Sequence, residues 1–139
     1  MHSRVPKRHN EYEMVYVLSP STTTAGATKV TDIIRESVDG HEGKILKVDL
    51  WGVRKLAYRI KGHKQGIYHY IRFLGTQQVV MEMERRLRIN EAVLRFLTVK
   101  LSKKPVDPAS YTVDEEESAF KPIDEILANL QASEQESPV

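Results

Sequence analysis

The order of the periodic segments in this sequence predicts a mixed α+β domain built as strand, helix, strand, strand, helix and strand. Two observations carry this prediction: four stretches, one of them interrupted, are rich in strand-forming residues, and two others have apolar residues three and four positions apart. A chain of 139 residues is long enough for one hydrophobic core but not for two. We therefore expect one domain with additional residues at its ends.

The first strand is predicted at residues 11–18, which are rich in strand formers and stop before Pro20, a residue without a backbone N–H. The hydroxyl groups of residues 21–24 then offer N-cap acceptors to a helix. The apolar face of this helix follows from its spacing and comprises Val30, Ile33, Ile34 and Val38. We expect the helix to end near Asp39 and Gly40, where glycine can take the left-handed cap conformation.

A long antiparallel arm is predicted next. Residues 44–50 and 56–60 have strand character on either side of Gly52, and a glycine inside a strand often marks a bulge. Residues 61–66 are polar and contain two glycines, so we expect a hairpin loop there. The returning strand is predicted at residues 67–74.

The second helix is predicted at residues 76–88, with a buried stripe formed by Val80, Met83 and Leu87. A last strand follows at residues 93–101. The resulting β-α-β-β-α-β order is typical of the ferredoxin-like split βαβ fold. We therefore expect a four-stranded antiparallel sheet with two helices on one face and the other face open for binding.

Charge divides the chain into a basic body and an acidic end. Residues 1–104 hold 20 of the 21 Lys and Arg against 10 acids, whereas residues 105–139 hold Lys121 and 9 acids. We expect a basic leader at residues 1–10, a ferredoxin-like domain at 11–101 and a flexible acidic tail at 102–139, with a short helix at 122–132. A basic body favours a polyanionic partner, although scattered surface charge also serves solubility.

Composition excludes several protein classes. The chain has no cysteine, so it can form neither a disulfide nor a thiolate metal site, which fits a reducing compartment. No apolar stretch reaches the length needed to span a membrane, and the first residues lack the apolar segment of a signal peptide. We therefore expect a soluble cytoplasmic protein.

Motifs of enzyme chemistry are missing from the sequence. The five histidines do not follow metal-binding H-E-x-x-H spacing, and no glycine-rich run of the phosphate-cradling type is present. Ser19 and Ser21 lie outside a G-x-S-x-G motif and are better explained as capping residues. The sequence therefore predicts no metal, no cofactor and no small-molecule substrate.

Residues that favour RNA binding are more prominent. Alternation in the returning strand places Tyr68, Tyr70 and Arg72 on one side, which would be the open face, although the RNA-recognition consensus is absent and a protein could dock there instead. Arg54 and Lys55 form a dibasic pair beside the predicted strand irregularity. The arginines at 85, 86 and 88 also have a simpler explanation as the solvent-facing side of the second helix.

Three segments in the expected order resemble one family. Residues 12–20, residues 51–60 followed by 65–68, and residues 84–89 leading to 93–100 are similar to bacterial-type small-subunit ribosomal protein S six (S6). The resemblance covers residues 11–101. It implies a ferredoxin-like, non-catalytic protein of the cytoplasmic ribosome that binds the central domain of small-subunit ribosomal RNA. It also implies pairing with ribosomal protein S eighteen (S18) during assembly.

Within this resemblance we assign two sets of residues. The expected RNA contacts, in order of preference, are Arg54, Lys55, Arg88, Arg95, Arg4, Lys7 and Arg8. The expected partner-protein surface comprises Tyr68, Tyr70, Arg72, Trp51 and Val53. Two alternatives stay open: a free-standing regulatory binding module of the same fold, and a small phosphate-ester or acyl-phosphate hydrolase. The hydrolase would need an arginine and an asparagine in the loop at 19–22, where neither occurs.

Overall fold

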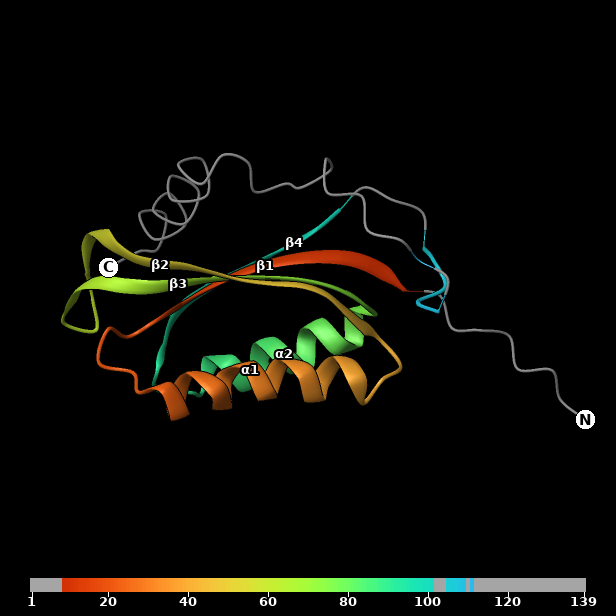
Figure 1. The fold of residues 1–139 in the computed structure, drawn as a ribbon, viewed down its shortest axis with the longest axis horizontal. Coiled ribbons are helices and arrows are strands. Elements are labelled where there is room, and N and C mark those ends of the chain that lie inside the picture. The colour runs from red at the N-terminus through yellow and green to blue at the C-terminus, as the bar shows by residue number, and fades with distance from the viewer. Residues whose placement is uncertain (1–8, 102–104, 110, 112–139) are drawn as a thin grey trace, which may run out of the picture.

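The computed structural model describes residues 9–101, 105–109 and 111 of the chain. Their elements follow the predicted order and are shown in Figure 1. The strands and helices are β1 (Asn10–Leu18), α1 (Thr24–Asp39), β2 (Lys44–Ile60), β3 (His63–Gly75), α2 (Gln77–Arg88) and β4 (Val93–Lys100).

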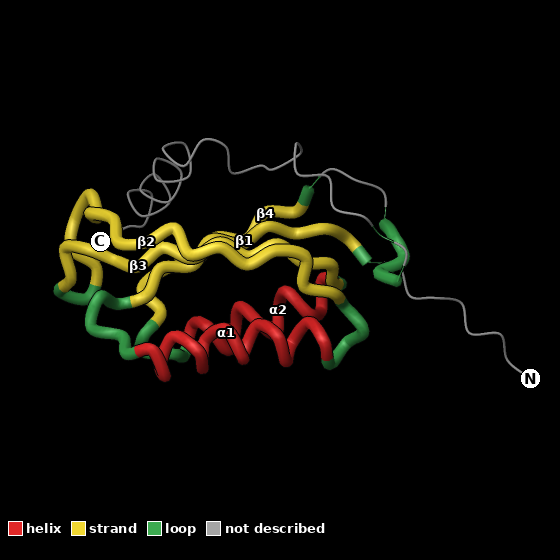
Figure 2. The backbone as a smooth tube through the Cα atoms, viewed as in Figure 1, coloured by secondary structure: helices red, strands yellow, loops and turns green. Residues whose placement is uncertain are grey.

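The four strands form one antiparallel sheet in the order β2-β3-β1-β4, so β1 and β3 are central and β2 and β4 are the edges. Both helices lie against the same face of this sheet, as Figures 1 and 2 show. This arrangement confirms the predicted ferredoxin-like fold. The loop after β1 and the β2–β3 turn lie at one end of the sheet, the end at which β4 begins.

The main core lies between the sheet and the helices. Alternate residues of β1 and β3 point into it because successive strand residues face opposite sides. The predicted helical stripes meet these residues, except that Val79 is fully buried where Val80 was predicted and Val80 is only partly buried. The fully buried members are Met14, Tyr16, Leu18, Val30, Ile34, Val38, Ile71, Phe73, Val79, Met83 and Leu87.

The end of α1 differs from the prediction. Gly40 keeps a right-handed conformation with φ −65°, and the left-handed conformation occurs instead at Glu42, with φ 61°. A Cβ on Gly40 would lie 2.7 Å from the carbonyl oxygen of Glu36, which accepts a hydrogen bond from the Gly40 N–H. Glycine is therefore needed here for close backbone approach and not for a positive φ.

The β2–β3 arm is longer and more continuous than predicted. β2 is one strand whose pairing register shifts between Leu50 and Gly52, and Gly52 has φ +89°, so the predicted irregularity is a bulge. The turn consists of Lys61 and Gly62 alone, both with positive φ. Because two positive φ angles match the twist of a tight hairpin, β3 already begins at His63, and the loop predicted at 61–66 was too long.

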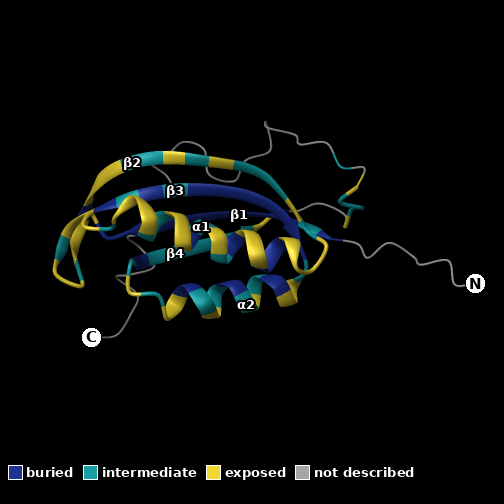
Figure 3. Cartoon of the chain, turned by 60° about the horizontal axis from the view of Figure 1, so that its bottom comes forward, coloured by how far each residue is buried: buried dark blue, intermediate teal, exposed yellow. Residues whose placement is uncertain are grey.

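A second apolar cluster covers the face that lacks helices. Its buried members are Val15, Val17, Leu56, Tyr68, Tyr70 and Leu94, and Trp51 packs against them. Figure 3 shows that burial is concentrated in β1 and β3, whereas β2 alternates between exposed and intermediate residues along most of its length. The sheet therefore has a packed centre and a largely exposed edge at β2.

The folded region extends past β4 at the other end of the sheet. The backbone of Val106 exchanges two hydrogen bonds of 2.8 Å with that of His9, and the Tyr111 hydroxyl donates to Glu11. The rest of the predicted tail, including the helix expected at 122–132, lies outside the described residues, as does the predicted leader up to residue 8.

Candidate nucleic-acid interface

The predicted dibasic pair lies on the hairpin arm. Arg54 pairs with Gly66 and Lys55 with Gln65, and neighbouring strand residues point to opposite faces, so the two cations lie on opposite sides of the arm. Both are exposed. The Arg54 guanidinium donates a 3.1 Å hydrogen bond to the carbonyl oxygen of Val53. The arm therefore carries positive charge on both of its faces.

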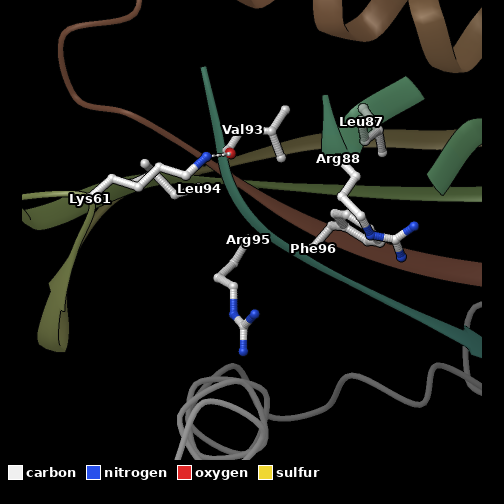
Figure 4. A pocket seen from close by; sticks show the side chains of 7 residues that line it. All are labelled: Lys61, Leu87, Arg88, Val93, Leu94, Arg95 and Phe96. Carbon is white, nitrogen blue, oxygen red and sulfur yellow. Dashed lines mark hydrogen bonds between the residues drawn. The ribbon is translucent and has the colours of Figure 1, made fainter. Parts of the chain in front are cut away.

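A second basic group gathers where β4 begins. A hollow of about 460 Å³ is lined there by residues from the β2–β3 turn, the end of α2 and β4. These residues are Lys61, Leu87, Arg88, Val93, Leu94, Arg95 and Phe96 (Figure 4). We call this space the basic hollow, because three of its lining side chains are cations.

Two predicted arginines reach the basic hollow from opposite sides of β4. Phe96 pairs with Tyr16 of the helix-side core, and the Arg88 guanidinium carbon lies 5.5 Å from the Phe96 ring centroid in a cation–π contact. Arg95 pairs with Val17, so it points to the helix-free face. Burial lowers the pKa of Arg95 below its usual value, but a guanidinium stays protonated at neutral pH.

Lys61 completes this group and was missed as a site residue in the sequence. Its Nζ donates a 3.2 Å hydrogen bond to the carbonyl oxygen of Val93, which holds the ammonium group beside the start of β4. The polar, glycine-containing run around it indicates a turn but not where the turn points. Three cations from distant parts of the sequence thus border one hollow, an arrangement suited to the phosphates of a nucleic acid.

The other arginines of α2 are explained by the fold. Arg86 forms a 3.0 Å ion pair with Glu36 of α1 and also donates to Ser37, so it joins the two helices. Arg85 is exposed on the helix surface, as the simpler interpretation of these residues expects. Of the three arginines at the end of α2, only Arg88 lines the basic hollow.

The predicted aromatic face is on the expected side of the sheet, but its side chains are buried. Tyr68, Tyr70 and Arg72 are 2%, 4% and 1% exposed, respectively, whereas an open docking face was predicted. Trp51 stacks on Tyr70 with ring centroids 5.1 Å apart, and the Tyr70 hydroxyl donates to Glu13. These side chains are therefore packed within the domain and leave little surface for a partner.

A different apolar surface is exposed along β2. Val48, Leu50 and Val53 are 40%, 68% and 52% exposed, and each pairs with a β3 residue on the helix side of the sheet. We call these three residues the β2 apolar edge. The sequence placed only Val53 in the partner surface, because alternation identifies the faces of a strand but not whether the strand is central or at an edge.

Three of the predicted RNA contacts belong to the leader. Arg4, Lys7 and Arg8 lie outside the described residues.

Within the described ranges, no group of three or more His, Asp or Glu is placed to hold a metal ion. In the same part of the chain, no helix has both the length and the apolar composition needed to cross a membrane.

Comparison with known proteins identifies one family. The family described as "Ribosomal protein S6" matches residues 11–100. The chain is 42% identical to the small ribosomal subunit protein bS6 of Trichlorobacter lovleyi, an alignment that covers 68% of this chain and 78% of that protein. It is 30% identical to the bS6 protein of Rickettsia bellii, over 85% of this chain and 98% of that protein.

A solved structure agrees with these sequence relatives. The crystal structure of 30S ribosomal protein S6 from Thermotoga maritima superposes with a TM-score of 0.61 at 26% sequence identity. The match covers 67% of this chain and 88% of that one.

Proposed function

Because the chain belongs to the ribosomal protein S6 family, we propose that it binds small-subunit ribosomal RNA through its basic surface and does so together with ribosomal protein S18. Proteins of this family are structural components of the small ribosomal subunit and are not enzymes, and bacterial ribosomes are cytoplasmic. Membership thus confirms the assignment to the ribosome. What we propose is which residues of the chain contact the RNA and which contact S18.

The basic hollow is the observation that carries the RNA assignment. Arg88, Arg95 and Lys61 line it from the end of α2, from β4 and from the tight β2–β3 turn, so the fold fixes where the three side chains start. Phosphate contacts of this kind set the register of an RNA on a protein and supply most of its salt-dependent affinity. Arg54 and Lys55 on the arm extend the basic surface and form a secondary contact.

The β2 apolar edge is the surface that best fits a protein partner. Exposed apolar side chains along an edge strand are a liability unless something covers them, and β2 also presents unpaired backbone groups along this edge. The resemblance to S6 implies S18 as the protein partner, and we assign the β2 apolar edge to the contact with S18. The predicted residues Trp51, Tyr68, Tyr70 and Arg72 then pack on the opposite, helix-free face of the sheet instead of forming the contact.

The proposal is tested by recovering the tagged full chain from its own cells. We expect small-subunit ribosomal RNA and one small basic protein to be recovered with it after washing in high salt. Sequencing of the RNA and mass spectrometry of the proteins identify both. Recovery of the chain free of ribosomal particles would instead support a free-standing regulatory module of the same fold.

A further inference from the structure

A second hollow of about 320 Å³ adjoins the basic hollow and shares Lys61 and Leu94 with it. It lies between the loop after β1, the β2–β3 turn and the residues before β4. Its polar lining differs from that of the basic hollow, because hydroxyl groups, an imidazole and a carboxylate replace the arginines. These groups belong to Ser19, Ser21, Thr22, His63 and Glu91.

Some of these groups already have partners. The Ser19 hydroxyl lies 2.8 Å from the Ser21 hydroxyl and 3.2 Å from Nε2 of His63, and Ser19 is 6% exposed. Thr22 Oγ1 is different, because it is buried and has no hydrogen-bond partner among the described residues. A buried hydroxyl without a partner is unfavourable, so a ligand that hydrogen-bonds to it is favoured.

Glu91 limits which chemical groups can bind in the second hollow. Its carboxylate accepts hydrogen bonds and repels anions, and within the described part of the chain no hydrogen bond or ion pair involves it. A second phosphate is therefore disfavoured in this hollow. A neutral group that both donates and accepts hydrogen bonds fits it, with a phosphate directly beside it at Lys61.

We propose that the second hollow binds a ribose of the RNA, whose 2′-hydroxyl contacts Thr22 and Glu91 while the adjoining phosphate lies at Lys61. The 2′-hydroxyl is the group that distinguishes RNA from DNA in such sites. The two hollows together then recognise consecutive parts of one RNA backbone: phosphate at Arg88 and Arg95, and sugar at Thr22 and Glu91. This inference rests on the proposed RNA binding.

The test uses the full chain and small-subunit RNA transcripts in which scattered nucleotides carry 2′-deoxyribose. The tagged chain and the remaining small-subunit proteins are assembled on these transcripts, and particles that contain the chain are recovered. We expect the recovered RNA to be depleted about threefold to tenfold in 2′-deoxyribose at one or two neighbouring positions, because the missing 2′-hydroxyl no longer hydrogen-bonds to Thr22 and Glu91.

Variants of residues that line the second hollow show whether this hollow causes the depletion. Thr22→Val and Glu91→Ala should remove the depletion while the chain still assembles, and Thr22→Ser should retain it because the hydroxyl is kept. Thr28→Val and Glu84→Ala, outside both hollows, are matched controls and should behave like the unmodified chain.

Three outcomes separate the possibilities. Depletion that disappears in Thr22→Val and Glu91→Ala supports the ribose site. Absence of depletion, or depletion that persists unchanged in both variants, overturns the site while RNA binding stands. Failure of the unmodified chain to enter particles contradicts the proposed function itself.

Discussion

Arg72 of β3 and Glu11 of β1 form an ion pair on the helix-free face, with 1% of each side chain exposed. Arg72 lies directly opposite Glu13 and reaches diagonally to Glu11, and Tyr70 reaches diagonally to Glu13 in the same way. The Tyr111 hydroxyl donates to the second oxygen of Glu11. Two buried carboxylates are thus held by side chains of the neighbouring strand, and one of them also by the segment after β4.

Breaking the buried ion pair should destabilise the domain strongly. Arg72→Met leaves the Glu11 carboxylate without its cation, and we expect the free energy of unfolding to fall by about 3–5 kcal/mol. The double variant Glu11→Leu with Arg72→Met removes both charges and should lose less than the single variant. Urea denaturation of the three proteins measures this difference. A loss below about 1 kcal/mol in Arg72→Met would show that the pair does not act as a buried charge pair.

His69 should make stability depend on pH. Its ring stacks on Tyr16 with centroids 4.8 Å apart, its Nδ1 donates to the carbonyl oxygen of Ile67, and burial lowers its pKa from the usual 6.5. Between the folded and unfolded pKa values the unfolded chain binds more protons, so stability is complete above about pH 6.5 and is lost as the pH falls through the folded pKa.

We expect His69→Phe, which keeps a stacked ring, to reduce this loss of stability below pH 6.5. The measurement is the free energy of unfolding against pH for both proteins, and the informative quantity is their difference. Parallel curves across the acidic range would show that His69 does not contribute to the pH dependence.

Removal of positive charge from the basic hollow should weaken RNA binding in a salt-dependent way. Each lost phosphate contact reduces the slope of log affinity against log salt by about 0.7–0.9, so Arg88→Ala with Arg95→Ala should reduce it by about 1.4–1.8. Arg54→Ala with Lys55→Ala removes the same charge from the arm and should have a smaller effect. If the two double variants reduced this slope equally, the arm would contribute as many phosphate contacts as the basic hollow does.

The β2 apolar edge should control partner binding without affecting folding. Leu50→Glu places a charge on a 68% exposed side chain, so the free energy of unfolding should change by less than about 0.5 kcal/mol. Binding to S18 should weaken about fivefold or more, as expected for a central interface residue. Met81→Glu, at a 63% exposed position on α2, is the matched control. If both variants bind S18 equally well, the partner occupies another surface.

The sequence predicted most of the fold because local patterns determine it. Hydrophobic spacing located both helices, and Gly52 marked the bulge, since a glycine within a strand signals an irregular backbone. The burial of Arg72 could not be predicted in this way, because its partner Glu11 lies 61 residues away. Lys61 was missed for a similar reason: its role depends on a turn that directs it towards β4.

Crosslinking within the ribosome locates the residues of this chain that contact RNA. Small subunits that contain the full chain are irradiated with ultraviolet light, and mass spectrometry identifies the peptides attached to RNA. If the basic hollow binds RNA, crosslinks form in peptides that contain Lys61, Arg88 and Arg95, and none form on the outer surface of α1. Crosslinks confined to α1, or absence of the chain from small subunits, would contradict it.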